Sequence, residues 1–231
     1  MKSQVNGGHR PSIYSFMERP IAPERIEQMS FEAIDRECGP HQFTPEQWVV
    51  VRRMIHTTAD FGLMGEVRFS PGAIEAGIEA FRKKSPIYAD SNMIKAGLSL
   101  ARLTKVNPAY TKDDVHCHIA DPDVAAECKK SGAPRSLFAA RKAKSALDGG
   151  VAVIGNAPVA LMEISRMIAE GEARPALVIA MPVGFIHVVE SKEELMSLDV
   201  PYIVAGGRRG GSPMAVSVVH SLLILAGEGE E

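Results

Sequence analysis

The sequence predicts a mixed α/β fold in which helices cover both faces of a mainly parallel β-sheet. Short apolar segments alternate with helical patterns from Pro86 onward. These segments show little polar alternation, as expected of strands buried on both faces, and Gly, Pro or Asp bounds each of them. The chain has 231 residues, of which 45% are apolar and 23% charged, so it suffices for one such domain with a single core.

Five segments are the predicted strands. They are Pro86–Asp90, Asp114–Ile119, Gly150–Gly155, Ala176–Met181 and Pro201–Ala205. The predicted helices between and after them are Asn92–Leu103, Ala133–Leu147, Pro158–Glu170, Ser191–Leu198 and Pro213–Ala226. With five strands, the simplest arrangement is a flavodoxin-like, doubly wound five-stranded parallel sheet of order 2-1-3-4-5.

Three further helices are predicted ahead of this sheet. Pro23–Cys38 is an extra N-terminal helical segment. The second helix begins at Pro45 and closes at Gly62, and the third runs from a turn at residues 70–72 to about Lys84. Residues 1–19 mix Gly, Pro, Ser and Arg without periodicity, so we expect a loose N-terminal leader followed by a single α/β domain over residues 20–231.

Composition and charge exclude several classes of protein. The formal net charge of -2 gives no strong field for nucleic acid. The chain has no apolar run of transmembrane length, and its N-terminus lacks the apolar centre of a signal peptide, so we expect a cytoplasmic protein with no membrane partner. Three widely spaced cysteines without a C-x-x-C motif fit reduced thiols.

One titratable side chain, His56, lies beside the apolar stripe of the helix that Thr44 and Pro45 begin. The residues that share the apolar face are Trp48, Val51, Ile55 and Ala59. His56 falls on the flank of that face, where a histidine can simply pack at the edge of a core. It can also act as a proton donor, because the carbonyl dipoles near a helix C-terminus favour imidazolium.

Ligands of open α/β sheets bind outside the carboxyl ends of the strands, where two glycine-containing connections lie. The loop 206–212 (GGRRGGS) offers backbone N–H groups and two arginines to an anion, or is a plain flexible turn. It lacks the spacing of a P-loop or of a dinucleotide fingerprint. The turn 155–158 (GNAP) offers free N–H groups at a helix N-terminus, or only good capping. For His116–His118 a metal site is not favoured, because no further ligand pair has suitable spacing.

Three polar residues have plain structural explanations as well as functional ones. Ser30 is in mid-helix, where a serine commonly bonds back to its own helix. Arg135 opens a helix and is expected to be solvated there. Lys192 follows Glu190 and Ser191, which can cap a helix, although the group can also address a substrate.

Five segments together resemble the precorrin-8X methylmutase family of corrin biosynthesis, also called precorrin isomerases. The resemblance covers roughly residues 24–225. The segments are RRMIHTTAD, APRSLFAARKA, VAVIGNAPVAL, PALVIAMPVGFIHVVESKEEL and GGRRGGSPMA, in that order.

This resemblance implies a flavodoxin-like homodimer that needs no cofactor and no metal ion. It implies an isomerase, an intramolecular methyl transferase that moves a methyl group from carbon 11 to carbon 12 of precorrin-8X or cobalt-precorrin-8 by a 1,5-sigmatropic shift, which gives hydrogenobyrinate or cobyrinate. His56 would be the catalytic histidine that gives or holds a proton at a ring nitrogen, and Ser30 would contact the substrate. The remaining implied substrate contacts are Ser99, Arg135, Asn156, Lys192 and Arg208.

Two alternatives stay open at this point. The first is a tetrapyrrole or corrinoid carrier in which His56 only clamps the ligand. The second is a nucleotide or sugar-phosphate domain that uses the loop 206–212. A shift within a conjugated ring needs only the right tautomer and a held geometry, which one acid near its own pKa can supply.

Overall fold

The computed structural model describes residues 20–227, which divide into two compact units. The first unit ends at Gly39 and the second begins at Pro40. In the first unit the described residues form one helix, α2 (Pro23–Glu37), so the predicted N-terminal helical segment is present. The predicted leader, residues 1–19, lies outside the described residues.

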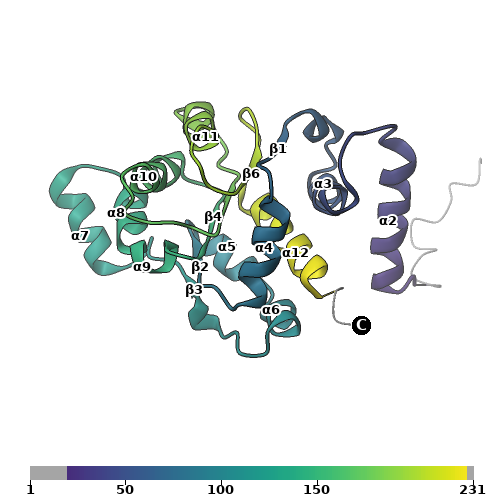
Figure 1. Ribbon diagram of the computed structural model, residues 1–231, viewed down its shortest axis with the longest axis horizontal. Coiled ribbons are helices and arrows are strands. Elements are labelled where there is room, and N and C mark those ends of the chain that lie inside the picture. The colour runs from purple at the N-terminus through teal and green to yellow at the C-terminus, as the bar shows by residue number, and fades with distance from the viewer. Residues whose placement is uncertain (1–19, 228–231) are drawn as a thin grey trace, which may run out of the picture. The chain divides into compact units, whose positions relative to one another are not determined.

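The second unit is built on a six-stranded sheet (Figure 1). Its strands are β1 (Val67–Phe69), β2 (Ile87–Ala89), β3 (Val115–His116), β4 (Val151–Ile154), β5 (Leu177–Ala180) and β6 (Tyr202–Ala205). They stand in the order β1-β6-β5-β4-β2-β3, and every neighbouring pair is parallel except β1 with β6. The predicted mixed α/β class is confirmed, whereas the predicted count of five strands is wrong.

The strand that the sequence did not predict is β1, which pairs antiparallel with β6 and places Val67 opposite Ala205. Ser70 continues this pairing, because its hydroxyl accepts the backbone N–H of Tyr202 at 2.8 Å. β1 has only three residues, which is too short to show the alternation that marks a half-buried strand.

The helices of this unit follow in chain order. They are α3 (Pro45–Thr58), α4 (Ala73–Arg82), α5 (Asn92–Gly97), α6 (Leu100–Val106), α7 (Pro122–Ser131), α8 (Arg135–Lys142), α9 (Lys144–Leu147), α10 (Pro158–Ala169), α11 (Val188–Met196) and α12 (Ser212–Gly227). Two single predicted helices are each divided, at Ser99 and at Ala143. Ser99 has extended backbone and caps α6 by accepting the N–H of Arg102 at 3.3 Å. α7 was not predicted, because its exposed residues are mostly polar.

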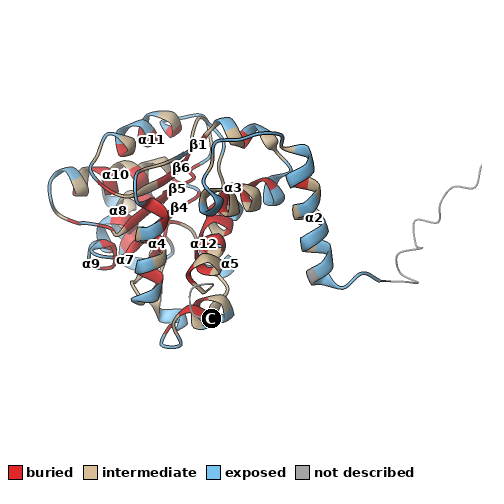
Figure 2. Cartoon of the chain, turned by 45° about the vertical axis from the view of Figure 1, so that its right-hand side comes forward, coloured by how far each residue is buried: buried red, intermediate tan, exposed pale blue. Residues whose placement is uncertain are grey.

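Helices cover both faces of the sheet (Figure 1). On one face, α10 packs between α8 and α11 over a core that includes Tyr88 and Leu161. On the other face, α12 contacts β4 and β5 and packs against α3, α4, α5 and α6. α12 is buried along most of its length, as Figure 2 shows, because nearly all of its side chains are apolar or small. Among the described residues, no helix is long and apolar enough to cross a membrane.

Candidate active site

α3 carries His56 in its last turn. Thr44 and Gln47 form a capping box at its start. The helix ends one turn earlier than predicted, because Ala59, rather than Gly62, adopts the left-handed C-cap conformation with φ of 53°. The helix packs against α12, and its buried residues are Val50, Val51, Met54 and Ile55. The His56 side chain is exposed, outside this packing.

A cavity of about 350 Å³ lies beside this part of α3. From α3 it is lined by Arg53 and Thr57, the residues three before and one after His56. α5 and α12 supply the other walls. Their lining residues are Met93, Gly97, Pro213, Val216, Ser217 and His220. His56 therefore lies on a turn of helix that borders a cavity.

His220, which the sequence analysis missed, is a neutral histidine in the wall of this cavity. Its Nε2 accepts the backbone N–H of Ser99 at 3.2 Å, so the ring proton is on Nδ1. Burial lowers the pKa of His220 to about 4, and the charges of Arg102 and Arg53 add to this effect. The only signal in the sequence is a polar ring within the apolar run of α12. The Ser99 hydroxyl, predicted to contact substrate, is occupied as the cap of α6.

Lys192 holds the loop after β6, residues 206–212, through hydrogen bonds to the backbone of the loop. The Lys192 side chain is 1% exposed, and its Nζ donates to the carbonyl oxygens of Gly207 at 2.9 Å and Arg209 at 2.8 Å. Burial lowers the pKa of Lys192 to about 8, which leaves the ammonium mostly charged at neutral pH. The prediction placed Lys192 at the substrate, whereas its ammonium lies against the backbone of the loop.

The two arginines of this loop have different surroundings. Arg208 is exposed, and its guanidinium carbon lies 5.4 Å from the centre of the Phe185 ring, which is itself 79% exposed. The Nε of Arg209 donates to Oδ2 of Asp60 at 2.8 Å, four residues after His56. The loop after β6 and the end of α3 are therefore joined side chain to side chain.

The N–H groups of the turn after β4, residues 155–158, are already bonded to a carboxyl group of the chain itself. Oδ1 of Asp90, at the end of β2, accepts the N–H of Gly155 at 3.1 Å. Its Oδ2 accepts the N–H groups of Asn156 at 2.9 Å and Ala157 at 2.6 Å. Burial raises the pKa of Asp90. This effect outweighs that of the backbone hydrogen bonds, which lower the pKa. The interpretation of this turn as a free anion site is therefore wrong, although the Asn156 side chain is exposed.

Arg135, another predicted contact, lies apart from this cavity. Arg135 is exposed at the start of α8, which covers the opposite face of the sheet from α3 (Figure 1). Ser30 belongs to the first unit, where its hydroxyl donates to the carbonyl of Ile26 at 2.9 Å, as expected of a mid-helix serine. Its relation to His56 stays a prediction.

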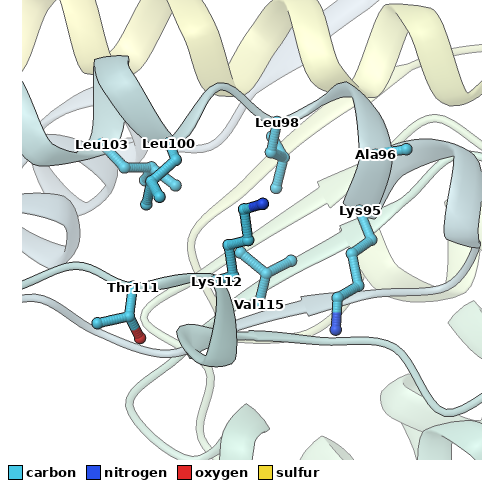
Figure 3. A pocket seen from close by; sticks show the side chains of 8 residues that line it. All are labelled: Lys95, Ala96, Leu98, Leu100, Leu103, Thr111, Lys112 and Val115. Atoms are coloured by element: carbon cyan, nitrogen blue, oxygen red, sulfur yellow. The ribbon is translucent and has the colours of Figure 1, made fainter.

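A second cavity, of about 240 Å³, is bordered by α5, α6 and β3 (Figure 3). Its lining is apolar apart from Lys95, Thr111 and Lys112, and the Lys112 side chain reaches toward Leu98. It contains none of the predicted site residues. Within residues 20–227, no group of three or more His, Cys, Asp or Glu side chains is placed to hold a metal ion. His118 instead pairs with Asp121, Nδ1 to Oδ2, at 2.9 Å.

Fold and site together define an α/β protein with an exposed histidine and an exposed arginine loop at one side of a mainly parallel sheet. The family model described as CbiC, precorrin-8X methylmutase, matches residues 25–225. The chain belongs to this family.

Individual relatives agree over most of the chain. A cobalt-precorrin-8 methylmutase of Priestia megaterium is 44% identical over 93% of both chains. One of Leptospira interrogans is 43% identical over 87% of this chain and 93% of its own. A crystal structure of a precorrin-8X methylmutase from Thermus thermophilus has 44% identity and a TM-score of 0.81, and the match covers 89% of this chain and 97% of that one.

Proposed function

We propose that this chain is a methylmutase of corrin biosynthesis in which His56 is the acid that moves the proton. It shifts a methyl group from carbon 11 to carbon 12 of precorrin-8X or cobalt-precorrin-8 within the ring. Family membership supports the reaction. The position of His56 supports its role, because the side chain is exposed on the helical turn that borders the cavity of Arg53 and Thr57.

The reaction requires from the protein only a proton and a fixed geometry of the substrate. A sigmatropic shift forms and breaks carbon–carbon bonds within one conjugated system, so no external nucleophile is required. Protonation of a ring nitrogen selects the tautomer from which the methyl group migrates. A positioned histidine suits this step, because an imidazole can both donate and accept a proton.

Substrate contacts are the second part of the proposal. Arg208, exposed at the carboxyl end of β6, would bind a side-chain carboxylate of the tetrapyrrole. Lys192 would act through the loop it holds, and Ser99 through the backbone N–H that it gives to His220. Asn156, Arg135 and Ser30 stay predicted contacts, as do the homodimer and the cytoplasmic location.

The test is a single-turnover experiment that follows the absorption spectrum of the bound ring. Both the cobalt-containing and the cobalt-free ring are used, because relatives with 44% identity bear both names. Wild-type protein should convert the chromophore of one ring or both. His56→Ala should bind it and leave its spectrum unchanged, with a fall in rate of at least about 1,000-fold.

His56→Ala that turns over at the wild-type rate would remove His56 from the mechanism. Wild-type protein that binds the ring without any spectral change would instead support the carrier. The carrier is not favoured, since the relatives are named as methylmutases.

A further inference from the structure

Arg209 joins the loop after β6 to the segment that follows α3 through an ion pair with Asp60, and the two oxygens of the Asp60 carboxylate accept different hydrogen bonds. Oδ1 accepts the N–H of Gly62 at 2.8 Å, which caps the short 3₁₀ helix Phe61–Gly65. Oδ2 accepts Nε–H of Arg209 at 2.8 Å. Asp60 directly follows Ala59, the C-cap of α3, so this contact lies at the end of the helix that carries His56.

The partner of Asp60 projects from a fixed backbone. Lys192 holds the carbonyl groups of Gly207 and Arg209. A Cβ atom at Gly210 would lie only 2.2 Å from the carbonyl oxygen of Met181, so the loop can pass over the end of β5 only with glycine there. The backbone position of Arg209 is therefore fixed.

The lack of a side chain at Gly62 leaves space for the Arg209 guanidinium. A Cβ atom at Gly62 would lie 2.9 Å from its Nη2. Its Nη1 lies 3.6 Å from Oε1 of Glu66, a second carboxylate on the same side. Both acidic groups come from the segment that follows α3, so this segment and the loop meet at a guanidinium.

We infer that Asp60 and Arg209 form a positioning pair that fixes the end of α3, and with it His56, against the loop after β6. Arg209 then acts on the reaction through α3, whereas its neighbour Arg208 faces the ligand. The two consecutive arginines thus divide the positioning of the acid and the binding of the substrate between them. This inference rests on the proposed role of His56.

The positioning pair is too exposed to matter much for folding. The Asp60 and Arg209 side chains are 40% and 46% exposed, and surface ion pairs of this kind contribute little to stability. Placement of a catalytic group is more sensitive, because a shift of about 1 Å can cost on the order of 100-fold in rate. Loss of the pair should therefore lower kcat in a protein that remains folded.

The experiment is a double-mutant cycle in kcat and KM with Asp60→Asn, Arg209→Gln and the double variant. Asn keeps the oxygen that caps Gly62 and removes the charge. Each single variant should lower kcat about tenfold with KM within about twofold, and the double variant should be no worse than either single variant. Lys83→Gln is the matched control, because it breaks an equally simple exposed ion pair with Glu79 on α4 and should leave kcat unchanged.

Three results would overturn the positioning pair. They are a wild-type kcat for Asp60→Asn, losses that multiply in the double variant, and an Arg209→Gln variant that raises KM at unchanged kcat, which would make Arg209 a direct ligand. Thermal unfolding midpoints within about 3 °C of wild type would assign the rate losses to positioning. If His56→Ala abolishes turnover while these variants keep wild-type kcat, only the pair is wrong, whereas an active His56→Ala variant overturns the proposed function.

Discussion

The two glycine-containing connections after β4 and β6 use their backbones in opposite ways. In the turn after β4, three N–H groups point inward to the carboxylate of Asp90. In the loop after β6, two carbonyl groups point inward to the ammonium of Lys192. The first connection is thereby closed to an external anion. The second is fixed with the Arg208 side chain outside, where a polycarboxylate can bind it.

A turn rich in N–H groups is therefore an anion site only if no side chain of the protein occupies it. Asp90 lies at the end of β2, next to β4 in the sheet, at the point where the chain changes direction across the sheet. Ligands of this architecture commonly bind at such a point. Here the buried carboxylate occupies it, and the candidate site lies instead along α3 and the loop after β6.

The largest effect is expected in the turn after β4, whose N–H groups are bonded to Asp90. Asp90→Ala leaves three N–H groups without their acceptor in a buried place and should lower the free energy of unfolding by about 4 kcal/mol. Urea unfolding followed by circular dichroism measures it. Asp90→Asn, which keeps one acceptor oxygen, should lose about 2 kcal/mol. A loss below about 1 kcal/mol for the alanine variant would mean that the turn holds itself.

In the loop after β6, Lys192→Met is expected to change the kinetic constants. The methionine fills the same space without holding Gly207 and Arg209, so the arginines lose their fixed origin. We expect kcat/KM to fall about 100-fold in steady-state assays. Lys144→Met, at an exposed ion pair with Glu172 remote from the loop, is the control. Wild-type kcat/KM in Lys192→Met would show that the loop needs no support.

A pH experiment tests whether His220, like the turn after β4, is occupied within the protein. Its Nε2 accepts the backbone N–H of Ser99. Its pKa is about 4 in the fold, below the ordinary value of 6.5, so the unfolded chain binds the proton more readily. Stability should therefore fall as the pH is lowered from about 6.5 to about 4, by about 2 kcal/mol from this group. His220→Gln, which can still accept the Ser99 N–H, should show a flatter pH dependence, and an unchanged slope would contradict it.

The smallest effects are expected at the outer side of the loop. Arg208→Gln removes a charged contact to a substrate carboxylate and should raise KM about tenfold with kcat within about threefold. Phe185→Leu removes the ring beside the guanidinium and should raise KM about threefold. An Arg208→Gln variant with unchanged KM would place the carboxylate elsewhere.

Much of the fold could be predicted from the sequence. Buried parallel strands such as Val151–Ile154 are continuous apolar runs, and they were found. β1 escaped because its three residues owe their strand conformation to β6 rather than to any local pattern. The division of one predicted helix at Ser99 escaped for a similar reason, since its backbone N–H is bonded to His220, 121 positions away.

The site was predictable only in part. His56 stays a prediction, drawn from its place on an amphipathic helix and from the family resemblance, and residues 206–212 were singled out by their glycines and arginines. The occupation of the GNAP turn by Asp90 and the pairing of Asp60 with Arg209 join segments 65 to 67 and 149 positions apart. Such partners depend on tertiary packing, which a single sequence does not display.

The most direct measurement is a crystal structure of the protein with its corrin product bound. We expect the ring beside α3, with a nitrogen edge within hydrogen-bond reach of His56 and a carboxylate on Arg208, while Asp90 still holds the turn after β4. A product that lies in the cavity of Lys95 and Lys112, or one that displaces Asp90 from its N–H groups and leaves His56 in solvent, would contradict it.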